Sequence, residues 1–298
     1  MKKFLINIAI FFAIVAVVDF SLGKVFHYLQ ARGGGRTGAE YYACKESNED
    51  VIILGSSRAM HHYVPSIIED SLEMSCYNAG QDGNGIIMQY GRWKMISERY
   101  APKIVIYDVT PEFDLLENDN MAYIDRLKPF CNDVEVKQYV SSIFPFERLK
   151  LISNMYCFNY KFIEMLSDCF HSKNNNNKGY FPEYGQVKLA AIEKLKKTKQ
   201  TNPIKLDEVK LLYLESLARE CKEQNVKLVF IVSPWLKGGI FSKGTFASVA
   251  EIAKRNGASF CYFNDGVLSS DENIFKDTYH LNDKGARLFT TDLIDKIF

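Results

Sequence analysis

The sequence predicts a doubly wound three-layer α/β sandwich, in which helices cover both faces of a parallel β-sheet. Short apolar runs alternate with amphipathic segments along most of the chain, and glycine or proline turns end these runs. The runs are almost continuously apolar, which is typical of parallel strands buried on both faces. With 298 residues, the chain is long enough to fold as one large α/β domain.

Five apolar runs have the length of strands. They lie at 50–54, 74–78, 103–109, 226–232 and 258–263. Five segments between or after them have helical spacing, at 65–73, 86–100, 206–224, 245–256 and 282–298. Gly55-Ser56-Ser57 ends the first strand, the glycine-rich stretch 79–85 ends the second, and Thr110-Pro111 ends the third. The alternation gives a flavodoxin-like, five-stranded parallel sheet within a domain at 49–298.

A helical insertion interrupts the alternation after the third strand, at about 112–205. Segments 134–152 and 155–167 have helical spacing, and 172–178 is a polar loop. An insertion here lies at the edge where α/β sheets bind ligands. We therefore expect either a helical hairpin without a functional role or a lid over a site, and the sequence leaves both open.

The amino terminus predicts a membrane helix over 1–30, followed by a spacer over 31–48. The apolar run 4–18, extended to Leu22, is just long enough to cross a bilayer. A cleaved signal peptide is the alternative, but 16–19 has no small residue at the cut, which favours an uncleaved anchor. The glycine-rich stretch 31–40 is typical of a flexible spacer.

The two lysines before the apolar run favour export of the domain that follows it. Lys24, Arg32 and Arg36 beyond the run dilute this signal. We expect a membrane-anchored protein with an extracytoplasmic domain, at the periplasm or the cell surface.

Composition excludes several classes of protein. Apolar residues make up 47% and charged residues 24%, so the chain is not disordered as a whole. The net charge of +1, without a basic run, argues against a nucleic-acid binder. Seven cysteines include no C-x-x-C pair, and no cofactor motif is visible, so we expect neither a metal site nor a cofactor.

Four residues that together could form a nucleophilic active site follow the predicted strands. Ser57 follows the first strand, at the start of a helix whose free N–H groups stabilise an oxyanion. Gly83 lies after the second strand, where a missing side chain lets a backbone N–H approach a substrate. The spacing of Asp277 and His280 lets the carboxylate orient the imidazole as a general base for Ser57. The carboxyl ends of parallel strands share one edge, so we expect these residues to meet there.

Each of these signals is weak alone. A Gly-Ser-Ser turn is commonly a capped helix start, and Asp-x-x-His is commonly a helix cap with a surface histidine. The stretch 55–59 also lacks the second glycine of a G-x-S-x-G elbow, so the chain is not an ordinary α/β-hydrolase. The hypothesis of a catalytic site depends on the predicted position of both motifs at the same edge of the sheet.

The same motifs resemble those of the SGNH (GDSL-type) hydrolases. Gly55-Ser56-Ser57 resembles the first block, with Ser57 as the nucleophile. Segment 78–83 resembles the second block, in which Gly83 supplies an oxyanion N–H. Asp277 and His280, followed by Leu281-Asn282 and Gly285, resemble the last block, which carries the acid and the base.

The third block departs from the family pattern. The family places an asparagine after the third strand, whereas this chain has Thr110-Pro111-Glu112. The resemblance implies substrate or oxyanion contacts from Asn78, Thr110 and Glu112. Arg58, beside the nucleophile, fits either an anionic substrate group or a surface salt bridge.

The anchor, the Gly-Ser-Ser turn and the missing asparagine are also similar to the D-alanyl-transfer protein of teichoic acid modification and to SGNH partners of membrane-bound O-acyltransferases. The resemblance implies a serine esterase or O-acyltransferase that acts on acyl groups of a cell-surface polysaccharide, with a membrane-bound O-acyltransferase as a partner. Two other hypotheses stay open. One is a catalytically silent SGNH-like module that binds glycan or organises an assembly, and the other is a lipid esterase.

Overall fold

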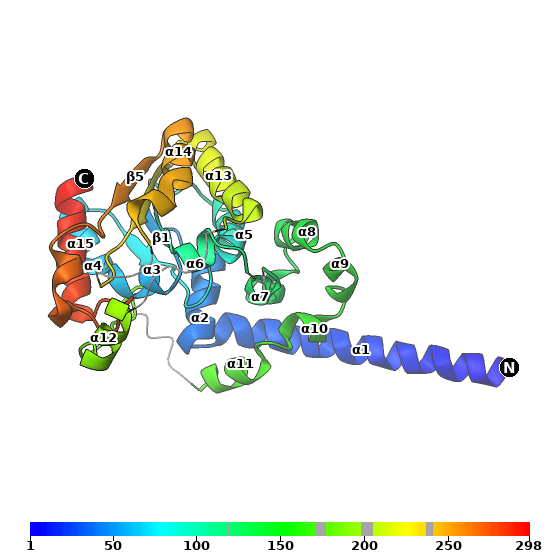
Figure 1. The fold of residues 1–298 in the computed structure, drawn as a ribbon. Coiled ribbons are helices and arrows are strands. Elements are labelled where there is room, and N and C mark those ends of the chain that lie inside the picture. Colours follow the sequence, from blue (N-terminus) through cyan, green and yellow to red (C-terminus); the bar gives the residue numbers. More distant parts are fainter. Residues whose placement is uncertain (119, 171–176, 198–204, 237–240) are drawn as a thin grey trace. The chain divides into compact units, whose positions relative to one another are not determined.

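The computed structural model describes the chain except residues 119, 171–176, 198–204 and 237–240. It divides into two compact units (Figure 1). We call them the helical unit, Met1–Lys45 with Met121–Asn174, and the α/β unit, Glu46–Asn120 with Asn175–Phe298. Most of the predicted spacer and most of the predicted insertion therefore belong together in the helical unit.

The α/β unit contains a five-stranded parallel sheet, which confirms the predicted fold class. The strands are β1 (Val51–Gly55), β2 (Cys76–Asn78), β3 (Ile104–Asp108), β4 (Lys227–Val232) and β5 (Ser259–Tyr262), in the order β2-β1-β3-β4-β5. Ile53 lies opposite Ile106, and Ile106 lies opposite Val229. These aliphatic side chains are fully buried, so hydrophobic burial sets the register.

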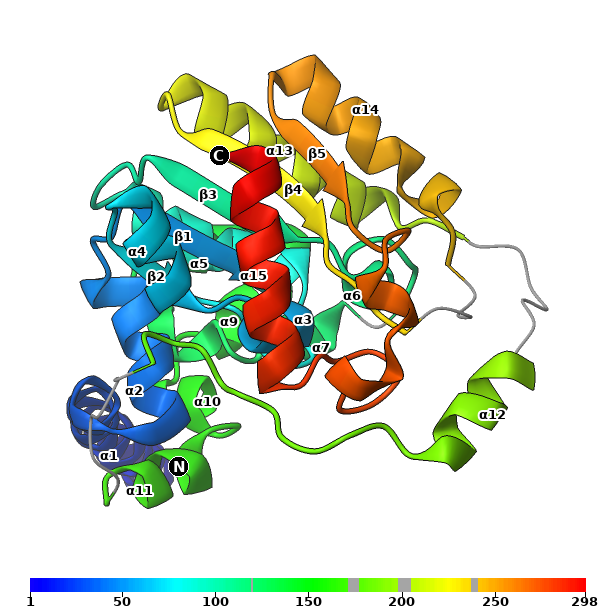
Figure 2. The same cartoon turned by 90° about the vertical axis from the view of Figure 1, so that its left-hand side faces the viewer.

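Helices cover both faces of the sheet (Figure 2). On one face lie α3 (Ser57–His62), α4 (Pro65–Leu72) and α15 (Asp283–Ile297); on the other lie α5 (Ile86–Ser97), α13 (Glu208–Glu223) and α14 (Ala247–Asn256). Side chains cap α13 and α15. Asp207 accepts from Val209 N at 2.9 Å, and Asn282 Oδ1 accepts from Gly285 N at 3.0 Å. Each cap delays the helix start by a residue or two relative to the sequence prediction.

Short elements lie at the edge where the strands end. They are α6 (Pro111–Asp114), α12 (Leu189–Lys197) and the 3₁₀ turns η3 (Lys243–Phe246), η4 (Leu268–Ser270) and η5 (Glu272–Ile274). Both α6 and α12 lie inside the predicted insertion but belong to the α/β unit, so the separate helical part is narrower than 112–205. The sequence analysis missed α12, which buries only Ile192 and Leu195.

The helical unit begins with α1 (Lys2–Arg32), α2 (Gly35–Tyr41) and the π-helix η1 (Tyr42–Glu46). From the insertion it takes α7 (Met121–Ile124), the 3₁₀ turn η2 (Lys128–Phe130), α8 (Val134–Ile143), α9 (Glu147–Lys150), α10 (Asn154–Phe158) and α11 (Phe162–Asp168). The predicted helix at 134–152 breaks before Pro145, because a residue that precedes proline disfavours helical geometry. The polar loop predicted at 172–178 lies outside the described residues except at Asn177 and Lys178.

The prediction of a flexible spacer at 31–40 is wrong. Thr37 N donates to Asp168 Oδ2 at 2.9 Å, and Gly34 N donates to the Asp168 carbonyl at 3.0 Å. Arg126 Nη1 pairs with Glu40 Oε1 at 2.7 Å, and Lys161 also pairs with that carboxylate. These buried partners from the insertion hold the stretch in helical form, and glycine content alone does not reveal them.

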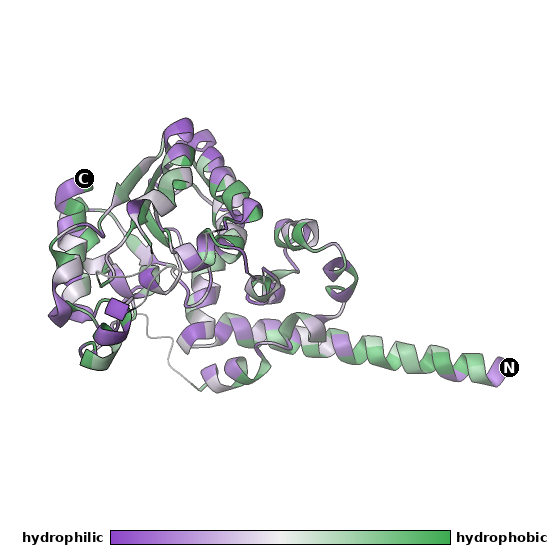
Figure 3. Ribbon diagram, viewed as in Figure 1, coloured by the Kyte–Doolittle hydropathy of each residue, from purple (hydrophilic) through white to green (hydrophobic). Residues whose placement is uncertain are grey.

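Helix α1 has two different halves (Figure 3). Its apolar first half is exposed, with Phe11, Phe12 and Val15 at 61%, 64% and 46% exposure. Its second half packs on the insertion, where the Phe26 ring lies 5.4 Å from that of Phe158. The helix is long and apolar enough to cross a membrane, and its apolar half is not packed into a protein core.

Gly55 should be indispensable for the turn that ends β1. Its φ of +137° lies where L-residues are strained, and an added Cβ would lie 2.7 Å from the Asp108 carbonyl oxygen. We expect Gly55→Ala to lower the free energy of unfolding by about 3 kcal/mol through backbone strain and overpacking. Urea unfolding followed by the fluorescence of Trp93 and Trp235, both in the α/β unit, measures this.

The matched control is Gly266→Ala, whose added Cβ meets nothing closer than 3.7 Å. It should leave the unfolding midpoint nearly unchanged. Equal midpoints for the Gly55 variant and the wild-type chain would contradict the strain argument.

Candidate active site

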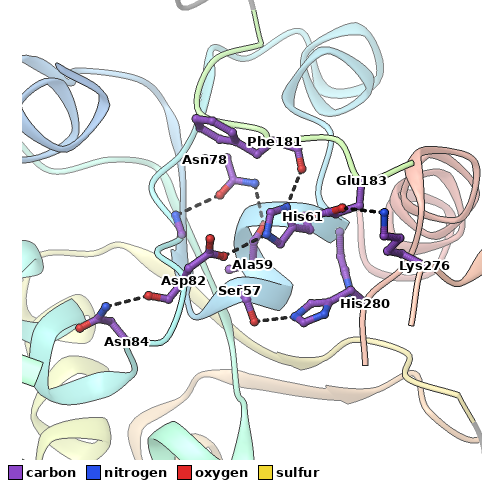
Figure 4. Close-up of polar contacts among 12 residues, drawn as sticks. Ser57, Ala59, His61, Asn78, Asp82, Asn84, Phe181, Glu183, Lys276 and His280 are labelled. Carbon is purple, nitrogen blue, oxygen red and sulfur yellow. Dashed lines mark hydrogen bonds and ion pairs between the residues drawn. The ribbon is translucent and has the colours of Figure 1, made fainter. Parts of the chain in front are cut away.

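Ser57, His280 and Asp277 form a continuous hydrogen-bonded chain, as predicted from their positions after the strands. His280 Nε2 lies 2.8 Å from Ser57 Oγ (Figure 4). His280 Nδ1 lies 2.9 Å from Asp277 Oδ2 and 3.1 Å from Oδ1. Since a carboxylate can only accept, Nδ1 carries the proton, and Nε2 is left to accept from the serine hydroxyl. The geometric prediction is confirmed, while the catalytic roles stay a prediction.

A tight turn places Asp277 against the histidine. The backbone N–H groups of Tyr279 and His280 each donate to Asp277 Oδ1 at 2.8 Å. Burial raises the pKa of Asp277, but the hydrogen bonds from the His280 ring and these two N–H groups outweigh it, so the pKa lies below its ordinary value. Asp277 is therefore ionised at neutral pH and holds the imidazole in the tautomer that a general base needs.

The end of β1 presents Ser57 at the first turn of α3. Ser56 is the extended N-cap residue and is fully buried, with no partner for its Oγ among the described residues. Ser57 is half-buried, so the two neighbouring hydroxyls are not equivalent. Gly80, from the loop after β2, lies so close to α3 that a Cβ would meet Met60 N at 2.5 Å. Backbone-to-backbone packing thus fixes the nucleophile turn beside that loop.

Arg58 does not reach the surface, and both predicted roles for it are wrong. Its side chain is 2% exposed and forms an ion pair with Asp108 at 3.3 Å. It also donates to the carbonyls of Ser233, at 3.2 Å, and Val109, while the Trp235 ring lies 4.8 Å from its guanidinium carbon. The guanidinium therefore joins the ends of β1, β3 and β4 beneath the nucleophile, and no face of it is left for a substrate anion.

Asn78 is also a structural residue rather than a substrate ligand. Its amide nitrogen donates to the carbonyls of Ala59, at 2.7 Å, and Tyr63, at 3.0 Å. Its Oδ1 accepts from Gly80 N at 3.0 Å. With 2% exposure, Asn78 ties the loop after β2 to the C-terminal end of α3, and the expected substrate contact is wrong.

Thr110, in the stretch where the family has an asparagine, forms hydrogen bonds within the protein. Thr110 is 5% exposed; its N–H donates to Asp114 Oδ2 at 2.6 Å and its Oγ1 accepts from Arg58 Nε at 3.3 Å. The predicted substrate contact by Thr110 is therefore wrong. Burial raises the pKa of Asp114 to about 6, although the hydrogen bonds it accepts act against this. Glu112 is half-buried, and burial together with the charge of Glu112 raises the pKa of Tyr279. The substrate contact by Glu112 stays a prediction.

Gly83 lies in an exposed turn after β2. Its φ of +67° is left-handed, and nothing lies within 4 Å of an added Cβ. The conformation therefore explains the glycine, whereas its role as an oxyanion donor stays a prediction.

His61 belongs to the site, although the sequence analysis did not identify it as a site residue. His61 is 7% exposed and lies one helical turn after Ser57 on α3. Its Nε2 lies 2.9 Å from Asp82 Oδ1 and its Nδ1 lies 2.6 Å from the Phe181 carbonyl oxygen (Figure 4). Both partners can only accept, so both bonds form when both ring nitrogens carry protons. His61 is then an imidazolium that joins the loop containing Gly83 to the segment around Phe181.

The pKa of His61 agrees with that assignment. Burial lowers the pKa, but the hydrogen bonds to Asp82 and to the Phe181 carbonyl, with the nearby charges of Asp82 and Glu183, raise it above its ordinary value. The His61 ring lies 5.7 Å from that of His280. One histidine is thus charged and the other free to accept a proton, because their partners differ.

His62 was also missed, and it supports the backbone beside His280. It is fully buried, its Nε2 accepts from Leu281 N at 3.0 Å, and its Nδ1 donates to Ser233 Oγ at 2.9 Å. Burial, and after it the nearby charges of His280 and Arg58, lower the pKa of His62 well below its ordinary value. A neutral His62 holds the strand-like segment that presents the catalytic imidazole. Nothing in the sequence indicates that, of the two adjacent histidines, His61 is charged and His62 is neutral.

The residues that the structure describes contain no cluster of three or more histidine, cysteine or acidic side chains able to hold a metal. No family model matches the chain, and no curated protein matches it. Solved structures similar to it include a "putative acylhydrolase" of Bacteroides fragilis, with 11% identity, a TM-score of 0.39, and coverage of 85% of this chain and 89% of that one. Another is a gut microbial diltiazem-metabolizing enzyme, with 12% identity, a TM-score of 0.40, and coverage of 84% of this chain and 46% of that one.

Replacement of Arg58 should affect stability rather than substrate affinity. In Arg58→Met, the buried Asp108 carboxylate loses its cationic partner, and we expect a loss of about 3–5 kcal/mol in the free energy of unfolding. Arg255→Met is the matched control. Its partner Glu215 lies 3.3 Å away at the surface, so the loss should stay below about 1 kcal/mol. A stable Arg58 variant with a raised KM would contradict the structural role.

The charge on His61 should appear in the pH dependence of stability. Its pKa is raised by folding, so its contribution is complete below the unfolded pKa of about 6.5 and is lost as the pH rises through the folded pKa. The stability difference between the wild-type chain and His61→Gln should therefore be larger near pH 6 than near pH 9. Asp82→Asn should abolish most of this pH dependence. Equal differences at both pH values would contradict the imidazolium assignment.

Proposed function

We propose that the chain is a membrane-anchored, extracytoplasmic serine esterase or O-acyltransferase that acts on acyl groups of a cell-surface glycan. The hydrogen-bonded chain Ser57–His280–Asp277 supports this most strongly. Its distances, 2.8 Å and 2.9 Å, fit a nucleophile, a general base and the acid that orients the base.

The reaction proceeds through an acyl-serine. His280 Nε2 takes the proton of Ser57 as Oγ attacks the acyl carbonyl, and the carbonyl oxygen becomes an oxyanion. When the intermediate collapses, the C–O bond to the donor alcohol breaks and His280 returns its proton to that alcohol. Water or an acceptor hydroxyl then attacks the acyl-serine, His280 takes its proton, and Ser57 regains it on release. Water gives an esterase, and a sugar hydroxyl gives a transferase.

The oxyanion hole depends on backbone donors. The N–H groups of the first turn of α3 have no partners within the helix, and they lie at the positive end of its dipole. Gly83 N–H is the second donor in this proposal. Thr110 N–H is already bound by Asp114, so it does not replace the missing asparagine. We therefore expect slow turnover of simple esters, since one lost donor costs about 10²-fold or more.

The surroundings favour a polar substrate. Asp277 and Asp82 side chains are 49% and 30% exposed, and Tyr279 is 41% exposed. Carboxylates beside the nucleophile suit hydroxyl-rich sugars better than an acyl chain buried along its length, which argues against the lipid esterase. The proposal includes export of the α/β unit, which the two lysines before the exposed apolar part of α1 support. It also includes a membrane-bound O-acyltransferase that supplies the acyl group.

One observation favours the second candidate, a catalytically silent glycan-binding or assembly module. The loop after β3 has no asparagine, and Thr110 in that loop is hydrogen-bonded to Arg58 and Asp114. In that case the triad would be geometrically intact but without sufficient oxyanion stabilisation to turn over an ester.

A fluorophosphonate probe distinguishes the two candidates. We expect it to label the wild-type chain at Ser57, and we expect Ser57→Ala to lose both labelling and nearly all turnover of an acetylated oligosaccharide. His280→Ala should lose nearly as much turnover, whereas Asp277→Asn should lose less, since the aspartate orients the base without moving the proton.

Ser270→Ala, at an exposed serine, is the control and should behave as the wild-type chain. A Ser57→Ala variant that turns over substrate normally would contradict the nucleophile assignment; absence of labelling in the wild-type chain would favour the silent module.

A further inference from the structure

Three large apolar side chains are exposed together around α9 in the helical unit. Phe146, Leu149 and Ile152 are 86%, 74% and 70% exposed. Their spacing of three residues places them close together on one side of the segment 146–152. Scattered exposed apolar residues need no explanation, but a contiguous group of this size marks a surface that is covered by something else.

A network of hydrogen bonds fixes this segment to α1. Ser153, the residue after Ile152, donates from its Oγ to Asp19 Oδ1 at 2.6 Å. The backbone N–H groups of Asn154 and Met155 donate to the same carboxylate at 2.9 Å each. Gly23 allows the close approach, since a Cβ there would lie 2.5 Å from the Asn154 side chain. The first turn of α10 is thus attached to α1 directly after its apolar run.

The attachment places α9 at the end of the candidate membrane span. In Figure 1, α9 lies farther than α10 and α11 toward the N-terminal end of α1. The apolar run 4–18, extended to Leu22, contains 19 residues, which corresponds to roughly 28 Å of helix against a hydrocarbon thickness of about 30 Å. Asp19 therefore lies near the end of the span, so the Asp19 network and α9 come to the lipid interface.

The charges around the apolar group identify a lipid surface rather than a protein as the occupant. Arg148 and Lys150 are exposed and alternate with the apolar residues, and Lys24 is exposed on α1. Lys150 pairs with Glu147 at 2.7 Å but keeps 53% of its side chain exposed. Apolar side chains that alternate with basic ones suit the boundary between acyl chains and anionic headgroups.

We propose that segment 146–152 is a second membrane contact, which inserts Phe146, Leu149 and Ile152 into the interface of the bilayer that α1 crosses. It holds the helical unit against the membrane rather than on a free stalk. The inference depends on the proposed membrane anchor, and its test separates the two.

The experiment introduces single tryptophans into the full chain, reconstituted in vesicles of phosphatidylcholine and phosphatidylglycerol with or without brominated acyl chains. Phe146→Trp reports on the segment, Val15→Trp on the anchor, and Val267→Trp, at an 87% exposed position of the α/β unit, is the control. The native Trp93 and Trp235 are buried in the α/β unit and give the baseline. Replacing an exposed side chain by tryptophan leaves the fold intact.

We expect bromine quenching and a blue-shifted emission for Phe146→Trp and Val15→Trp, and neither for Val267→Trp. If only Val15→Trp is quenched, the anchor stands and the proposed contact is overturned, as it would be if this surface bound a partner protein absent from the vesicles. If neither is quenched, the anchor itself is wrong, and the contact with it.

Discussion

The buried ion pair between Arg58 and Asp108 is the interaction on which the geometry of the candidate site depends. Asp108 ends β3, and Arg58 follows the nucleophile directly, so the pair connects the two strands on either side of the point where the chain order of the sheet reverses. Bonds from the guanidinium to the carbonyls of Val109 and Ser233 add β4 to the same cluster. A charge this deeply buried is costly unless every donor is satisfied, and this requirement fixes where α3 begins.

Above that cluster, three histidines of the same intrinsic chemistry are placed in three different states. His62 is enclosed and neutral, and it supports the backbone at Leu281. His61 faces two acceptors and is held as a cation. His280 faces one carboxylate and one hydroxyl, which leaves its Nε2 as a base. Hydrogen-bond partners and burial, rather than residue type, assign these roles.

In the helical unit, residues of the insertion pack around α1 and provide hydrogen-bond partners for one of its carboxylates. Its first helix exposes apolar side chains that water does not favour, while a carboxylate at residue 19 is satisfied by one hydroxyl and three amide groups of the insertion. Segments more than a hundred residues apart in the chain therefore form one compact body around α1. A glycine-rich stretch becomes ordered there because buried partners compensate for the entropy lost on ordering it.

The sequence by itself determined the parallel α/β sheet, the apolar first helix, and the meeting of Ser57, Asp277 and His280, because apolar periodicity sets the strands and strand ends share one edge. It predicted Asn78 and Thr110 as substrate or oxyanion contacts, and Arg58 as a partner of either a substrate anion or a surface salt bridge. All three side chains are buried, and position beside a nucleophile does not reveal burial. Only the tertiary structure decided that Arg58 lies beneath the site, that His61 bridges Asp82 and Phe181, and that Gly35–Tyr41 forms a helix. Each of these depends on partners distant in sequence, and a local pattern carries no information about which distant group will satisfy a buried charge or donor.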